Sequence, residues 1–292
     1  MVWVKKGVIF DPKVHIPFPD PIAQLPCVLD LSDQIIRVYF SYRDKGCSLP
    51  AFFDLNLEKL EIINLPCLSI GLEHGEIGTF DEHGVMPSCI VRIDENQVWM
   101  YYIGWSQGKS TPYRLSIGLA QSFDNGLSFK KYTQGSILGQ SHDEPFYATC
   151  PHVQKLKNKW CMWYSSGESW VHRPDCMESR YIIKYRESND GITWKKPKLP
   201  FEQNADAACA APSFCQINDE EVLWYSERNV LDFRQNKDAS YRILSMHILD
   251  DGTYKRASYD LAPAIPGEVC RNFWLKSWYL QNEVVFLRGI KS

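Results

Sequence analysis

The sequence lacks the features that would direct the protein to nucleic acid or into a membrane. It has no block of like charge, and its net charge is −3. Because nucleic-acid binding calls for a basic patch, we expect no nucleic-acid partner. No apolar run approaches the roughly 18 residues of a membrane helix, so no membrane span is expected. The composition, 45% hydrophobic and 23% charged, is that of an ordinary globular protein.

Signals for disulfide or zinc chemistry are also missing. None of the 10 cysteines belongs to a C-x-x-C pair, which disfavours a zinc or thioredoxin-like site. The N-terminal stretch MVWVKKGVIFDPKV does not resemble a secretion signal, because Lys5 and Lys6 interrupt its apolar residues. We therefore expect a cytoplasmic protein with reduced thiols. The sequence does not indicate an oligomeric state.

Motifs of phosphate, serine-hydrolase and metal sites are absent or incomplete. No G-x-S-x-G occurs, so the sequence has no motif that would indicate a serine hydrolase. GWSQGKST at Gly104 has the wrong glycine spacing for a phosphate-binding loop, and Pro112 follows where a helix is needed. The spacing of His142, Asp143, Glu144 and His152 matches no strong metal-ligand pattern. No metal or cofactor is therefore expected from these residues.

One repeat runs through the whole chain. Aromatic stretches begin at intervals of 100−38 = 62, 162−100 = 62, 223−162 = 61 and 285−223 = 62; they read VYFSYRD from Val38, MYYIGWS from Met100, MWYSSGE from Met162, LWYSERN from Leu223 and VFLRGIK from Val285. Three repeats also carry an Asx-Gly pair suited to a tight hairpin turn, at Asn125-Gly126, Asp190-Gly191 and Asp251-Gly252.

Each repeat thus predicts four strands, one after a proline, the aromatic one and two around the turn. Four-stranded units in a ring make a β-propeller. We predict an all-β fold, a single five-bladed propeller domain over residues 1–292. The fifth repeat lacks its outer hairpin, so the N-terminal strand VWVKKGVIF is expected to complete the last blade and close the ring. A β-sandwich is the alternative, but it would not explain the period.

Acidic residues keep the same phase as the strands. They are Asp20, Asp81, Glu144, Asp206 and Glu268, with steps of 61, 63, 62 and 62 residues. In a propeller these positions would form a ring at the mouth of the central channel, with Glu82 and Asp143 one residue away. A single acid before a turn often caps backbone N–H groups. For the whole set we favour a functional site, because three members are Asp, two are Glu, and their contexts diverge.

Close carboxylates flanked by aromatic side chains are typical of glycoside chemistry. One acid protonates the leaving oxygen, and the other attacks the sugar or activates water. Trp105, Trp170, Tyr42 and Tyr147 are candidates to stack on sugar rings. Arg43 and Arg228 follow their aromatic strands at nearly equivalent positions and could anchor a polyhydroxylated or anionic ligand. Most other tryptophans are expected to pack between blades.

The unit of acidic loop, aromatic strand and S-x-D-G-x-x-W resembles the five-bladed propeller glycosidases of glycoside hydrolase families 43, 32, 68 and 130. The third motif stands as SFDNGLSF at Ser122 and SNDGITW at Ser188. More narrowly, GTFDEHGVMPS, YYIGW and MWYSSGESW resemble glycosidase-like proteins encoded beside bacterial surface-polysaccharide genes. The resemblance implies Asp20 as base or nucleophile, Asp81 as a supporting acid and Glu144 as general acid, with Asp143 competing for that last role. It also leaves calcium in the channel as a minority alternative.

Three functions follow from these observations. The first is a glycosidase that uses Asp20, Asp81 and Glu144, with Arg43, Glu82, Trp105, Asp143, His152, Trp170, Asp206, Arg228 and Glu268 as substrate-binding candidates. The second is a sugar-transferring or phosphorolytic enzyme of polysaccharide biosynthesis, acting on a sugar nucleotide or phosphate held by Arg43, Arg228 and Arg271. The third is a propeller that binds a glycan without cleaving it.

Overall fold

The computed structural model describes residues 8–17, 21–156, 158–173, 176–217, 219–231, 233, 236–258, 279–280 and 283–284. The regular structure of these residues is almost wholly β. The helical segments are α1 (Pro12–His15) and a short 3-10 turn, η1 (Lys237–Ala239). None of the described helices is long and apolar enough to cross a membrane.

The strands form four antiparallel units, each built from consecutive strands. The first holds β1 (Gln24–Asp30), β2 (Ile35–Asp44), β3 (Cys47–Asn56) and β4 (Glu61–Ile62); the second holds β5 (Gly84–Arg92), β6 (Val98–Ser106), β7 (Arg114–Ser122) and β8 (Lys130–Lys131); the third holds β9 (Ala148–Leu156), β10 (Lys159–His172) and β11 (Met177–Ser188); the fourth holds β12 (Ala207–Ile217), β13 (Glu220–Asn229), β14 (Arg242–Ile248) and β15 (Tyr254–Arg256). A separate pair, β16 (Tyr279–Leu280) and β17 (Glu283–Val284), follows.

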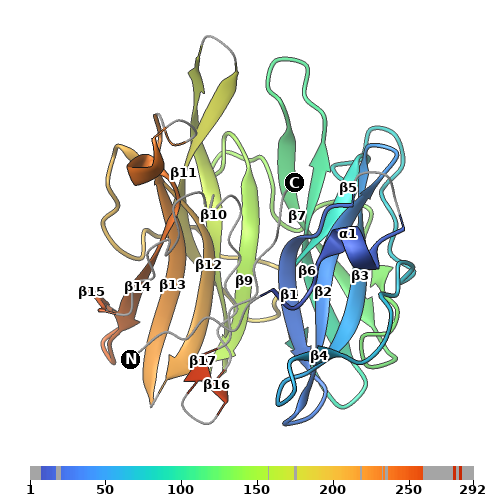
Figure 1. The fold of residues 1–292 in the computed structure, drawn as a ribbon. Coiled ribbons are helices and arrows are strands. Elements are labelled where there is room, and N and C mark those ends of the chain that lie inside the picture. Colours follow the sequence, from blue (N-terminus) through green and yellow to red (C-terminus); the bar gives the residue numbers. More distant parts are fainter. Residues whose placement is uncertain are drawn as a thin grey trace.

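The units stand side by side with their strands upright in Figure 1, β9–β15 on the left and β1–β7 on the right. The first two units are linked by one parallel pair, Ser48 with Gly84. In the third unit the fourth strand is reduced to a bridge between Tyr185 and Lys198. The β6–β7 and β10–β11 hairpins rise at the upper end. We call this end, where β1, β5, β9 and β12 begin, the rim face.

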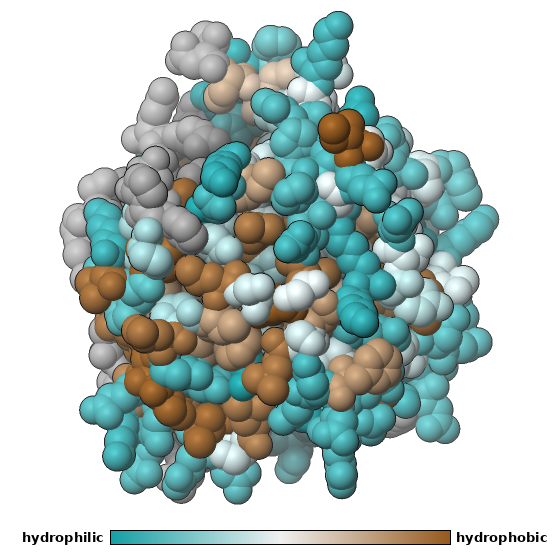
Figure 2. Space-filling model, turned by 90° about the vertical axis from the view of Figure 1, so that its right-hand side faces the viewer, coloured by the Kyte–Doolittle hydropathy of each residue, from teal (hydrophilic) through white to brown (hydrophobic). Residues whose placement is uncertain are grey.

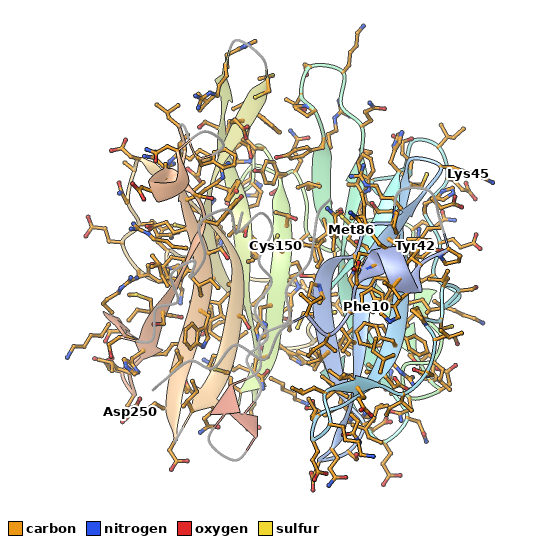
Figure 3. The ribbon with its side chains drawn as sticks, viewed as in Figure 1. Phe10, Tyr42, Lys45, Met86, Cys150 and Asp250 are labelled. Atoms are coloured by element: carbon orange, nitrogen blue, oxygen red, sulfur yellow. The ribbon has the colours of Figure 1, made fainter. Side chains whose placement is uncertain are left out.

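The repeated prolines mark a β-bulge in the first strand of every unit. The pairing with the second strand shifts register at Gln24/Cys27, Pro87/Cys89, Trp163/Ser165 and Ala210/Ser213. Proline within a sheet is confined to edges and bulges, which explains why it recurs at one phase. Side chains beside these bulges form one apolar cluster that includes Leu25, Met86 and Cys150. Met86 and Cys150 lie centrally, between the right-hand and left-hand units, in Figure 3.

Three of the main apolar cores lie between neighbouring units, and a fourth is formed by the first unit with the segment before it. Tyr39 and Tyr102 belong to the core of the first interface, Tyr101 and Tyr164 to that of the second, and Trp163 and Tyr225 to that of the third. Trp99 of β6 stacks on Trp160 of β10, with ring centroids 5.4 Å apart. The aromatic repeat therefore supplies both faces of each interface, as expected for tryptophans that pack between units.

The N-terminal strand prediction is wrong for Val8–Phe10, and its remainder lies outside the described residues. Val8–Phe10 are not in a strand. Asp11 caps α1 by accepting from the Lys13 backbone N–H, so the chain turns instead of extending. Phe10 stacks on Phe53 with centroids 4.7 Å apart, which holds the segment against the outer side of the first unit.

Figure 2, which views the right-hand side of the molecule, shows hydrophilic residues with an apolar group in the lower part.

The described cysteines are all free thiols and differ widely in exposure. Burial raises the pKa of the Cys150 thiol to about 12, and the pKa of Cys209 is raised as well. Cys176 is exposed. At pH 8 a thiol with a pKa of about 12 holds roughly a thousandfold less thiolate than an ordinary cysteine.

We expect a disulfide reagent to modify Cys176 first, and Cys150 and Cys209 only after unfolding. Mass mapping of labelled peptides measures this, and Cys176→Ser is the control; fast native labelling of Cys150 would contradict it.

Candidate functional site

Asp81 lies in the loop before β5, with an exposed fraction of 1%. Its carboxylate accepts hydrogen bonds from Thr79 Oγ1 at 3.1 Å and Tyr102 OH at 3.1 Å. Lys131 Nζ lies 2.6 Å from Oδ2. The local backbone is shaped to admit this side chain, since a Cβ on Gly75 would lie 2.1 Å from Asp81 Oδ1. Asp81 is thus buried, and its carboxylate is paired with two hydroxyl groups and one ammonium group.

Glu144 is enclosed in the same way before β9, with no exposed surface. Tyr164 OH and Ser166 Oγ both donate short hydrogen bonds to its carboxylate. Arg186 NH2 lies 3.0 Å from Oε1 and Lys184 Nζ lies 3.4 Å from Oε2. Tyr102 and Tyr164 occupy equivalent positions in their repeats. The two acids therefore have the same kinds of partner, a tyrosine hydroxyl and a cationic side chain.

The two acids have separate sets of partners: those of Asp81 include Tyr102 and Lys131 of the second unit, and those of Glu144 come from the third unit. Asp206 is exposed, and its backbone C=O accepts from Val230 N–H at 2.9 Å. Asp20 and Glu268 lie outside the described residues, and the parts of the ring assigned to them stay predictions. The described acids of the expected ring therefore differ in environment: two are buried and paired, and one is open to solvent.

A patch of accessible groups lies beside the Asp81 loop on the rim face. It consists of Arg43, Glu82, His83 and Trp105, and we call it the Trp105 patch. The guanidinium carbon of Arg43 lies 5.6 Å from the Trp105 ring centroid, and the His83 ring lies 5.4 Å from it. Trp105 Nε1 donates to Ser48 Oγ at 3.1 Å, which fixes the indole. Sequence reasoning missed His83, although it directly follows the Asp81-Glu82 pair.

Glycine at position 84 is needed for this arrangement. A Cβ there would lie 2.5 Å from Trp105 Nε1 and 2.7 Å from the Ser48 backbone nitrogen. Glu82 is held by the Gly78 N–H, which donates to its carboxylate at 2.7 Å. The Trp105 patch is therefore ordered by the backbone beneath it, while its charged ends stay accessible.

A second aromatic group comes from the hairpins of the second and third units. Trp170 is half-buried and packs edge-on to Tyr113, with centroids 5.0 Å apart. Tyr147 OH is hydrogen-bonded to Ser179 Oγ at 2.5 Å. Tyr42 and Tyr147 are 5% and 3% exposed, so neither offers a face to a sugar as placed. Trp170 remains accessible in part.

Asp143 differs sharply from its neighbour Glu144. Its side chain is 24% exposed, and His142 Nε2 lies 3.3 Å from Oδ1. Of the two acids that compete for the general-acid role, Asp143 is the one that solvent can reach.

Arg228 and His152 are both enclosed, although Arg228 pairs with Ala208 near the start of β12, at the rim end. Arg228 is 3% exposed and lies over the Phe233 ring at 3.9 Å. Its donors go to the hydroxyls of Tyr181 and Tyr241 and to the Ser179 carbonyl. His152 is 6% exposed on β9, near Trp163. The expectation that Arg228 anchors a ligand does not fit this placement, because neighbouring aromatic rings enclose it.

Among the described residues, no three His, Cys, Asp or Glu side chains gather in a way that could hold a metal ion. His142 and Asp143 are in contact, whereas Glu144 and His152 are buried. Calcium in the central channel stays a prediction.

Comparison with known sequences gives relatives without an assigned function. No family model matches the chain. An uncharacterised protein of Mycobacterium tuberculosis strain CDC 1551 / Oshkosh, MT1551, is 28% identical over 266 residues, which is 89% of this chain and 84% of that protein.

Comparison with solved structures identifies the fold. A structure of a BT0996 complex with RGII has a TM-score of 0.65 and 16% identity, covering 88% of this chain and 79% of that one. A structure described as a glycoside hydrolase has a TM-score of 0.62 and 16% identity, covering 82% of this chain and 74% of that one. The protein therefore has the β-propeller fold of glycoside hydrolases of the kind found in families 43 and 32.

Proposed function

We propose that this chain is a carbohydrate-active protein of the glycosidase type that binds a glycan on its rim face. The observation that carries the proposal is the Trp105 patch, where an ordered indole lies beside Arg43 and His83, with the Glu82 carboxylate 3.5 Å from the His83 ring nitrogen. Sugar sites combine an apolar face with a few convergent polar groups. Trp170 offers a second aromatic face on the neighbouring hairpin. The glycoside hydrolase fold supports the substrate class.

The chemistry of hydrolysis requires two carboxyl groups that reach the sugar. Glu144 and Asp81 are buried and paired with hydroxyl groups and cations, so we assign them to positioning the loops before β9 and β5. Asp143 takes the general-acid role in this proposal, because it is accessible and adjoins the anchored Glu144. Asp20 as base or nucleophile stays a prediction.

Binding without cleavage is the second candidate. It is favoured by the burial of Asp81 and Glu144 and by the apolar cluster of Leu25, Met86 and Cys150 among the first strands. Sugar transfer or phosphorolysis has less support: of the arginines proposed to hold phosphate, Arg43 is exposed, Arg228 is enclosed and Arg271 lies outside the described residues.

We also propose that the 62-residue repeat builds five blades within one domain of 292 residues, closed into a ring. The four described units and the β16–β17 pair support this count. The cytoplasmic location and the link to polysaccharide biosynthesis stay predictions.

The test is a glycan-array screen, followed by titration of the best ligand and mass analysis of the products. Trp105→Ala should weaken binding at least about tenfold, because stacking and ordered polar contacts are lost together. Asp143→Asn should leave binding within about twofold and abolish cleavage. Phe123→Ala, which removes an aromatic side chain that is 67% exposed outside the patch, is the matched control.

Recovery of an intact glycan from the unaltered protein would select the binding-only candidate. Unchanged affinity in Trp105→Ala would overturn the proposed site.

A further inference from the structure

A large cleft opens between the third and fourth units, away from the Trp105 patch. It has a volume of 1240 Å³ and is bordered by β11, by residues 198–200 and by the ends of β13, β14 and β15. Asp250, which lines it, is labelled at the lower left of Figure 3, at the end opposite the rim hairpins. Its volume exceeds the roughly 300–1,000 Å³ of common ligand pockets.

In the first two interfaces, a tyrosine of one unit is hydrogen-bonded to the Asx-Gly turn of the next unit. Tyr39 OH donates to the Gly126 carbonyl at 2.7 Å, and Tyr101 OH donates to the Gly191 carbonyl at 2.9 Å. In both cases this hydrogen bond holds the Asx-Gly turn against the preceding unit. The tyrosines are 101−39 = 62 residues apart.

The third interface departs from this pattern. Trp163 stands at the equivalent position, 163−101 = 62 residues on, and its indole N–H donates to Tyr254 OH at 2.8 Å instead. A Cβ on Gly252 would meet nothing within 4 Å, so this turn is not drawn inward. The turn is also built differently, because Gly252 N–H donates to the Leu249 carbonyl, where Gly126 and Gly191 use a serine hydroxyl. The turn at Gly252 is therefore not packed against the third unit, and Gly252 lines the cleft.

The lining has the mixed chemistry that a sugar requires. Tyr185 and Tyr254 are half-buried and contribute aromatic surface beside the Trp163 ring. Acceptors and donors come from both walls, with Lys198 from the third unit and Glu221 and Lys255 from the fourth. Carboxylates outnumber the lysines and arginines; they are Glu187, Asp219, Glu220, Glu221, Asp250 and Asp251. This excess disfavours a phosphate or another anion.

We propose that this cleft is a second ligand site, which binds a segment of a neutral oligosaccharide. Interleaved carboxylates and amines can hydrogen-bond hydroxyl groups along a chain of sugars, and the tyrosine rings supply apolar faces. The inference rests on the lining of the cleft and does not depend on chemistry at the rim.

Two indole N–H signals in the NMR spectrum separate the two sites. Trp163 reports on the cleft and Trp105 on the rim, and Trp163→Phe and Trp105→Phe assign them. The full chain is titrated with maltohexaose, cellohexaose and arabinohexaose to about 10 mM, a range that detects millimolar binding. We expect at least one of these sugars to shift the Trp163 signal.

The variant Lys198→Ala/Glu221→Ala removes one polar group from each wall. It should weaken the Trp163 response at least about tenfold while the Trp105 response is unchanged. The matched control is Lys130→Ala/Glu95→Ala, which removes the same two residue types from exposed positions of the second unit.

Each outcome separates this inference from the proposed function. A shift at Trp163 alone supports the cleft and contradicts glycan binding at the rim. A shift at Trp105 alone overturns the cleft site. A Trp163 response to inorganic phosphate or to an unrelated peptide, with none to any sugar, also overturns it.

Discussion

Replacing Glu144 by alanine is expected to lower the free energy of unfolding by about 3–5 kcal/mol. The cause is the charge that stays behind. Arg186 and Lys184 have side chains only 5% and 13% exposed. Without Glu144, Lys184 would keep Glu168 at 3.4 Å, but the buried Arg186 would lose this carboxylate. Removing one partner of a buried ion pair costs far more than the pair itself contributes, because the remaining charge is desolvated and uncompensated.

Urea unfolding of Glu144→Ala beside Asp143→Ala measures this effect with an adjacent control. Asp143 is 24% exposed and contacts His142, a surface-type pair, so its loss should cost at most about 1 kcal/mol. Glu144→Gln, which keeps the shape, should fall between the two. Equal midpoints for Glu144→Ala and Asp143→Ala would contradict the enclosed role. A loss of turnover in Glu144→Gln with unchanged stability would return the general-acid role to Glu144.

The repeat could be predicted from sequence because its determinants are local. Proline at one phase marks a bulge in the first strand of each unit, and Asx-Gly marks a turn with positive φ, as found at Gly126, Gly191 and Gly252. Strand pairing between consecutive segments then builds each unit. These features need only neighbours in the sequence, so the period revealed them.

The environments of the acids could not be predicted in the same way. The partners of Asp81 include Tyr102 and Lys131, which lie 21 and 50 residues further on. A signal was present in retrospect, since Tyr102 and Tyr164 keep nearly the same distance from their acids, 102−81 = 21 and 164−144 = 20. The same spacing would fit either a ring of accessible carboxylates or a series of buried acid–tyrosine pairs. Only the way the units pack decides which of the two forms.

Arg228 illustrates the same limit. Its position matches that of Arg43 in the repeat, yet Arg43 is exposed while Arg228 lies over Phe233. Phe233 and Tyr241 come from the segment that follows β13. Burial of an arginine depends on such neighbours, which no repeat phase encodes.

Alanine at the three turn glycines should destabilise the protein in a graded order, with Gly126 most sensitive, Gly191 next and Gly252 least. All three have nearly the same backbone, with φ of +78°, +76° and +79°, so the cost of placing an L-residue there, about 1–2 kcal/mol, is common to all. The surroundings differ. A Cβ would lie 2.2 Å from Tyr39 OH at Gly126, 2.9 Å from Tyr101 OH at Gly191, and free of any atom within 4 Å at Gly252.

Gly126→Ala should therefore cost about 1–3 kcal/mol more than Gly252→Ala, because the buried Tyr39 must shift and its hydrogen bond is lost. Urea unfolding of the three variants gives the differences directly, and Gly252→Ala serves as the control for backbone strain. If all three variants lost the same stability, the turns would be packed alike, and the third interface would not be open. The graded order thus tests the packing of the first two turns and, independently of any ligand, the origin of the cleft beside the third.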